Sequence, residues 1–242
     1  MNLNVTINLC SADVSRSKLS SLIVSSSNKS NKITNEEKIV KLMREKPFTI
    51  RCLKNIEEEI SKLSDVNSFF KEDGKGEHFN LLFHASQENC LDAFLFLLSR
   101  GADPSLKNNK GMSVLHLTAK NGQVFMGMKC LANLPWRQPI SVFINGCSES
   151  GWTPLMAAAE NDQLQFVRWL LSEKVSVNAT MKTGWTAMHA ASKKNNWEIV
   201  KLLLENGGDK NILASHRKFG KGLKVEDVTT DEKTRSILQQ WE

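Results

Sequence analysis

One octapeptide occurs twice in almost the same form, and the interval between the copies constrains the fold more than any other feature. Residues 151–158 read GWTPLMAA, and residues 184–191, thirty-three residues later, read GWTAMHAA. Weaker copies begin at Gly111 (GMSVLHLTAKNG) and at His78 (HFNLLFHASQEN). A period of this length is typical of chains built from stacked supersecondary units.

The residues within each copy predict two helices per unit. Thr153 and Thr186 precede apolar runs, where a hydroxyl caps free N–H groups, and Pro154 fits a first helical turn. A second apolar run with helical spacing follows, and in two copies it ends before Gly101 or Gly207, which suit a left-handed cap. Each helix–turn–helix unit buries its apolar face only by stacking on its neighbours.

The shared pattern G-x-T-P-L-H-x-A, the period and the turns GADPS and SVNAT resemble the ankyrin repeat family over roughly residues 50–242. The resemblance implies an all-α solenoid of helix–turn–helix units with short β-hairpin turns and about four recognisable repeats. It also implies a structural role for His116 and His189, which occupy the TPLH position. Each imidazole is expected to bond backbone in a neighbouring turn, rather than act as a base or metal ligand.

The period divides the chain into an array with a cap at each end. Thr34 is the expected N-cap of the first of two cap helices, with Glu37 at the capping-box position. We expect a disordered tail (1–33, with a targeting segment as the alternative), an N-terminal helical cap or degenerate repeat (34–77), repeat 1 (78–110), repeat 2 with an inserted loop (111–150), repeat 3 (151–183), repeat 4 with an extended turn (184–221) and a C-terminal capping repeat (222–242). The array is therefore expected to be complete.

Composition and motifs exclude several classes of function. The five cysteines are odd in number and widely spaced, which predicts a reduced intracellular protein, cytoplasmic or nuclear. No apolar run approaches the roughly 18 residues of a membrane span, and no secretory signal begins the chain. Phosphate-binding Gly loops, HExxH and GxSxG are absent. The sequence therefore predicts no catalytic residues, no cofactor and no metal, in a monomer.

The second residue of each repeat is bulky and apolar, which predicts an exposed stripe of such side chains. We expect this stripe on a concave face formed by the turns between repeats ("fingers") and the inner helices ("palm"). The alternative is that each ring packs flat on the neighbouring turn. The palm has mixed charge, which suits a protein or peptide better than a nucleic acid. The predicted partner-binding residues are Phe79, Met112, Glu149, Trp152, Glu160, Lys182, Trp185 and Lys193.

Repeat 2 contains seven residues beyond the usual period, near 134–141, including two prolines that cannot continue a helix. They predict a surface loop with Trp136 and Arg137. This loop is either a second partner-binding site or a tolerated insertion whose Trp136 packs back on the repeats. In the preceding helix, Met126 and Met128 beside Phe125 are interpreted as packing residues.

Two further features have both a functional and a structural interpretation. Asn178, with Leu170 eight residues before it, fits the layout that ankyrin proteins use for asparaginyl hydroxylation; alternatively, Asn178 only shapes its turn. A cluster of cations in the extended turn is either a basic patch or nuclear-import signal, or a solvated loop, which we favour. These cations are Arg217, Lys218, Lys221 and Lys224.

The expected function is that of a non-catalytic adaptor that binds a partner protein or peptide on its concave face. The alternative is a regulatory or scaffolding subunit of an enzyme or ubiquitin-ligase-type complex. That subunit would use the N-terminal segment or the Trp136 loop as a second docking site. A nuclear factor associated with nucleic acid is the least favoured, because a basic face with interleaved aromatic residues is missing.

Overall fold

Helices make up nearly all the regular structure of the described residues. The computed structural model describes residues 34–45, 50–71, 78–215 and 222–241. The tail predicted for residues 1–33 lies outside the described residues, as do Arg217, Lys218 and Lys221. Residues 35–242 form one compact unit.

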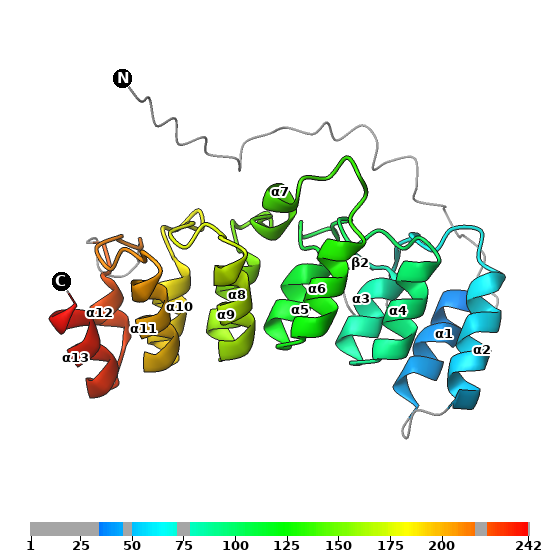
Figure 1. Cartoon of the computed structure of the whole chain (residues 1–242), viewed down its shortest axis with the longest axis horizontal. Coiled ribbons are helices and arrows are strands. Elements are labelled where there is room, and N and C mark those ends of the chain that lie inside the picture. The colour runs from blue at the N-terminus through cyan, green and yellow to red at the C-terminus, as the bar shows by residue number, and fades with distance from the viewer. Residues whose placement is uncertain (1–33, 46–49, 72–77, 216–221, 242) are drawn as a thin grey trace. The chain divides into compact units, whose positions relative to one another are not determined.

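The described residues form thirteen helices, and the expected all-α repeat architecture is confirmed (Figure 1). A two-stranded antiparallel sheet pairs Phe70 of β1 with Phe79 of β2. The helices are α1 (Asn35–Arg44), α2 (Ile50–Ser61), α3 (Leu81–Gln87), α4 (Leu91–Ser99), α5 (Val114–Lys120), α6 (Val124–Ala132), α7 (Ile140–Ile144), α8 (Pro154–Glu160), α9 (Leu164–Ser172), α10 (Ala187–Lys193), α11 (Trp197–Glu205), α12 (Val225–Val228) and α13 (Glu232–Gln240), and the strands are β1 (Phe70–Lys71) and β2 (His78–Phe79).

Side-chain caps determine where the inner helices of repeats 3 and 4 begin. The Thr153 side chain accepts a hydrogen bond from the Met156 N–H, and Pro154 is the first residue of α8. Thr186 caps α10 in the same way, through the N–H of His189. The predicted caps are confirmed, so the TP and TA dipeptides fix the start of each inner helix.

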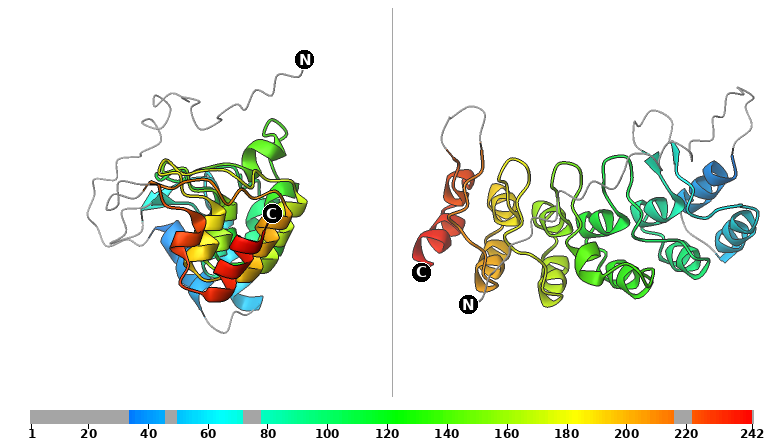
Figure 2. Two further views of the ribbon diagram at one scale, coloured as in Figure 1. Left: turned by 90° about the vertical axis from the view of Figure 1, so that its left-hand side faces the viewer. Right: turned by 90° about the horizontal axis from the view of Figure 1, so that it is seen from above.

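The helix pairs stack in two rows (Figure 2). The inner row contains α1, α3, α5, α8, α10 and α12, and each of these helices contacts the next; the outer row contains α2, α4, α6, α9, α11 and α13. Ala158 and Ala191 are fully buried in the inner row, where a small side chain allows close helix approach. In the outer row, Phe166 and Leu170 are completely buried, and such side chains each contribute roughly 1.5–3 kcal/mol.

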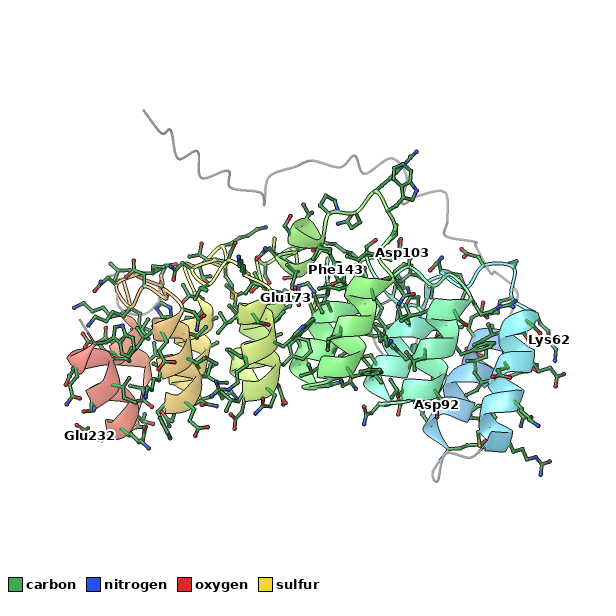
Figure 3. All side chains as sticks on the ribbon, in the orientation of Figure 1. Lys62, Asp92, Asp103, Phe143, Glu173 and Glu232 are labelled. Atoms are coloured by element: carbon green, nitrogen blue, oxygen red, sulfur yellow. The ribbon has the colours of Figure 1, made fainter. Side chains whose placement is uncertain are left out.

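The insertion in repeat 2 contains a short helix that the sequence does not predict. Phe143 of α7, labelled in Figure 3, and its neighbour Ile144 are buried in the core. Their burial attaches the far end of the inserted segment to the array. Trp136, in the loop before α7, is 86% exposed. The interpretation that Trp136 packs back on the repeats is therefore wrong, because Phe143 and Ile144 anchor the insertion instead.

Helix α6 departs from its expected packing. Met126 is buried, but Phe125 and Met128 are each 49% exposed. The packing interpretation is confirmed for Met126 and wrong for the other two residues. Met126 and Cys130, four residues apart, lie on the buried face of α6, whereas Phe125 and Met128, three residues apart, lie on its exposed face.

Glycine is required in the turns between repeats, and Gly151 allows a direct test. Its φ is +87°, and a Cβ there would lie 2.8 Å from the Met181 Cα. We expect Gly151→Ala to lower the free energy of unfolding by about 3 kcal/mol or more, from backbone strain plus the clash. Urea unfolding followed by circular dichroism measures this loss.

Gly101→Ala is the matched control. Gly101 has nearly the same φ, +86°, but a Cβ there meets nothing within 4 Å. This substitution should cost only about 1–2 kcal/mol, the strain of the left-handed backbone. Equal losses in the two variants would show that close approach of neighbouring turns does not require Gly151.

Candidate functional site

The turns between repeats, the fingers, are closed by the same backbone hydrogen bonds. The Asn108 N–H donates to the Met112 carbonyl at 2.8 Å, the Ser148 N–H to Trp152 at 2.9 Å, and the Met181 N–H to Trp185 at 2.8 Å. The carbonyl of the bulky residue after each Gly therefore closes the finger. The backbone of Met112, Trp152 and Trp185 is thus fixed before any partner binds.

Neighbouring fingers are also hydrogen-bonded to each other. The Glu149 N–H donates to the Lys110 carbonyl at 3.0 Å, and the Lys182 N–H donates to the Ser150 carbonyl at 3.1 Å. Glu149 and Lys182 are exposed residues, so their side chains border these junctions. The structure thereby brings two predicted charged site residues to equivalent places on consecutive fingers.

Trp185 lies against the inner helix of its own repeat. Its ring centroid is 5.2 Å from that of His189, and the Lys193 Nζ is 6.0 Å from the same indole centroid. Trp152 and Trp185 are both partly buried and pack against the core. The indoles are therefore neither sealed in the core nor fully solvated, and part of each remains available on this surface.

Phe79 does not belong to the exposed stripe. It is only 8% exposed, with its ring centroid 5.7 Å from Phe83 and 5.6 Å from His84. The prediction that Phe79 is an exposed binding residue is wrong, because β2 pairs with β1 and its ring is enclosed. The stripe is reduced to Met112, which is half-buried, Trp152 and Trp185.

The ends of the inner helices carry charges that alternate along the row. Lys120 is the last residue of α5, Glu160 of α8 and Lys193 of α10. The two lysines are exposed and Glu160 is half-buried. We call these three residues together with Met112, Glu149, Trp152, Lys182 and Trp185 the finger–palm face. Its alternating charges allow it to fix the orientation of a polar chain.

Two buried histidines connect the repeats, as the family resemblance implies. The Ser113 N–H donates to Nδ1 of His116, whose Nε2 lies 3.0 Å from the Trp152 carbonyl oxygen. Since Nδ1 accepts, Nε2 must hold the proton and donate it to Trp152. His189 makes the corresponding bond to the Leu223 carbonyl, at 3.2 Å. Through the first of these bonds, His116 of repeat 2 holds the backbone of Trp152, a finger–palm residue of repeat 3.

Burial keeps both imidazoles neutral. It lowers the pKa of His116 to about 4, against the partial compensation of the hydrogen bond to Trp152. Burial also lowers the pKa of His189. Neither group is poised as a general base near neutral pH, which agrees with a structural role.

Asparagine side chains form a second set of links between repeats. The Asn178 Nδ2 donates to the Gly207 carbonyl at 2.9 Å, and its Oδ1 accepts from the Asp209 N–H at 2.8 Å. Asn67 makes equivalent bonds to the corresponding turn of repeat 1. The sequence predicts either hydroxylation of Asn178 or a role in shaping its turn, and it does not reveal these bonds across repeats. Hydroxylation of this exposed residue stays a prediction.

The described residues contain no group of three or more His, Cys, Asp or Glu suited to a metal ion. Among the described cysteines, Cys130 is a free thiol and is fully buried. In that same part of the chain, no helix has the length and apolar character needed to cross a membrane.

Stacked helix pairs with hydrogen-bonded fingers define a helical repeat protein. A family model of ankyrin repeats (3 copies) matches residues 81–181 and 138–214, together more than half of the 242 residues. The chain belongs to the ankyrin repeat family. A comparison with curated proteins found no match. Ankyrin repeats are generally protein–protein interaction modules and are typically non-catalytic.

His116 predicts a pH-dependent stability. The His116 imidazole binds a proton near pH 6.5 in the unfolded chain, but only near pH 4 in the folded chain. The contribution of neutral His116 to the free energy of unfolding is therefore fully present above pH 6.5. It falls by roughly 3 kcal/mol between pH 6.5 and pH 4 and changes no further below pH 4. Urea unfolding between pH 7 and pH 4 measures it, with His116→Gln as the variant that lacks this component. An NMR titration of folded His116 near pH 6.5 would contradict the prediction.

Asn178→Ala tests the asparagine links. The substitution removes two hydrogen bonds between the turns of repeats 3 and 4 and should cost about 1–3 kcal/mol of unfolding free energy. Asn133→Ala is the control, because Asn133 bonds only the carbonyl of Lys129 within its own helix end. The prediction fails if urea denaturation gives both variants the same stability.

Proposed function

We propose that this protein is a non-catalytic adaptor that holds a partner protein or peptide against its finger–palm face. The observation that supports the proposal most directly is the placement of Trp152 and Trp185. Their backbones are fixed by hairpin hydrogen bonds, while their side chains remain partly exposed on consecutive fingers. Trp is enriched among residues that dominate binding energy.

The finger–palm face is already ordered before a partner binds, which favours recognition of a folded surface or an extended peptide. Because the fingers are hydrogen-bonded to one another, little ordering entropy is lost on association. Glu149 and Glu160 lie among its cations. The mixed charge disfavours a polyanion such as nucleic acid and favours a polar protein partner.

The cellular setting is part of this proposal. The odd number and wide spacing of the five cysteines favour the cytoplasm, the nucleus or both. We propose a monomer that needs no cofactor and recognises its partner through rigid contacts. Catalysis is not part of the proposed activity, since both TPLH-position imidazoles act in structural hydrogen bonds.

The exposure of Trp136 favours a second candidate function. An indole that is 86% exposed and separate from the finger–palm residues suits a second docking site. With two sites, the protein would act as a regulatory or scaffolding subunit, for example in an enzyme or ubiquitin-ligase-type complex.

The adaptor proposal predicts the effect of removing both indoles. Trp152→Ala/Trp185→Ala should lose the captured partner, because each buried Trp contributes about 2 kcal/mol, or about thirtyfold in affinity. Affinity capture from an extract of the cells that make the protein, with quantitative mass spectrometry, compares the variant with wild type. Circular dichroism and urea unfolding of the variant verify that the array remains folded.

Trp136→Ala is the matched control, since it removes the same side chain from a different surface. It should retain the proteins that the double variant loses. Equal recovery of every captured protein by the wild type and the folded double variant would disprove binding at the finger–palm face.

A further inference from the structure

The sequence distributes its charges unevenly along the array. Asp103 and Glu149 are consecutive acids, and the 104–148 segment between them contains no Asp or Glu. We call residues 104–148 the acid-free repeat. Its cations are Lys107, Lys110, Lys120, Lys129 and Arg137. Repeat 2 and its insertion are therefore positively charged in a chain whose other repeats mix both signs.

The same segment holds most of the large apolar side chains that the described residues expose. Two of them, Phe125 and Met128, lie one helical turn apart on α6. Trp136 follows in the loop, and Ile140 and Val142 lie on α7, at 52% and 47% exposure. The remaining ones, Phe69, Leu91 and Leu213, are scattered over other repeats. Exposed apolar residues gathered on one repeat, rather than dispersed, mark an interaction surface.

A cation lies over each exposed aromatic ring of this surface. The Lys129 Nζ is 5.1 Å from the Phe125 ring centroid, and the Arg137 Cζ is 4.4 Å from the Trp136 centroid. Among the described residues, neither Lys129 nor Arg137 has a carboxylate partner within ion-pair distance. Each pair thus offers an apolar ring next to a positive charge, and aromatic residues, Met and Arg are the types enriched at interfaces.

Acids on both sides limit the width of this surface. The outer helices that contact α6 are α4 and α9. Asp92 lies on α4 and Glu173 directly follows α9, and both residues are exposed (Figure 3). Packed helices are about 8–10 Å apart, so the surface free of acids is about one repeat wide. Such a strip matches a single peptide or helix lying along α6 and the loop.

We propose that the acid-free repeat is a docking site for an acidic, apolar peptide segment of a partner protein. Apolar side chains of the partner pack on Phe125, Met128 and Trp136. Its carboxylates pair with Lys129 and Arg137. None of these five contact residues belongs to the finger–palm face, so one molecule can hold two partners.

The charges of the alternative occupants disfavour them. The chain's own residues 1–33 contain four cations and one acid, so the positive acid-free repeat repels them. A second copy would bring the same positive surface against itself. An anionic membrane is flat and wide, and would also meet the exposed carboxylates of Asp92 and Glu173 on the neighbouring outer helices.

Selection from a random library tests the chemistry of the partner directly. Phage-displayed peptides of about sixteen residues, ~24 Å as a helix, are selected against the full chain. The proposal expects enriched peptides that combine Asp or Glu with Leu, Phe or Trp. Fluorescence anisotropy of an enriched peptide should show binding weakened at least about tenfold by Trp136→Ala, and more by Lys129→Glu/Arg137→Glu.

Lys54→Glu/Lys201→Glu is the matched control, because it changes the net charge equally at exposed residues of other outer helices, α2 and α11. The control should bind the enriched peptide as wild type does. The Trp152→Ala/Trp185→Ala variant should also bind it, so failure of the adaptor proposal leaves this result unaffected.

Four results would overturn the docking site. They are a selection that enriches no peptide, enrichment of peptides without acids, binding that Lys129→Glu/Arg137→Glu leaves unchanged, and use of this surface by another occupant. The last is measured by two assays of the full chain and of that variant. Sedimentation detects self-association, and flotation detects binding to vesicles with about one quarter phosphatidylserine.

Discussion

Contact between the inner helices of successive repeats is the interaction on which the rest of this structure depends. A single pair of these short helices cannot bury its own apolar face, so each pair is stable only against its neighbours. Alanines such as Ala158 and Ala191 let the helices approach closely, and the fingers then come within hydrogen-bonding reach. Glycine at position 151 is a consequence of that approach, since a larger residue would meet the next finger.

The candidate binding surface follows from the same stacking. Trp152 is held by its own hairpin and by the imidazole of His116 from the preceding repeat. Burial between repeats keeps that imidazole neutral by lowering its pKa to about 4. The stability of the array and the geometry of its recognition surface are therefore set by the same contacts, and changes at His116 affect both.

The sequence predicts whatever recurs with the period and fails where a single repeat departs from it. Thr153, Thr186 and Pro154 repeat a known capping chemistry, so the helix starts are predictable. Phe79 occupies the same position as Trp152, yet it is buried, because the strand pairing with Phe70 occurs once and outside the recognisable pattern.

The insertion shows the same limit. Its prolines predict a loop, but burial of Phe143 depends on distant residues that no local pattern reveals. Exposure of Phe125 beside buried Met126 is equally dependent on where neighbouring helices lie. Asn67 follows Asp-Val and Asn178 follows Ser-Val, so the sequence shows that the two asparagines occupy similar places before a turn. Their hydrogen bonds to the next repeat are visible only in the structure.

The position of the acid-free repeat within the row has a consequence for partial unfolding. In linear arrays, opening begins at helix pairs that have a neighbour on one side only, and it progresses inward. Helices α5, α6, α8 and α9 have packed helices on both sides in the described unit. Fraying of α1 and α2 or of α13 would leave both proposed docking surfaces formed, and a client bound at the centre would dissociate only when the middle of the array melts.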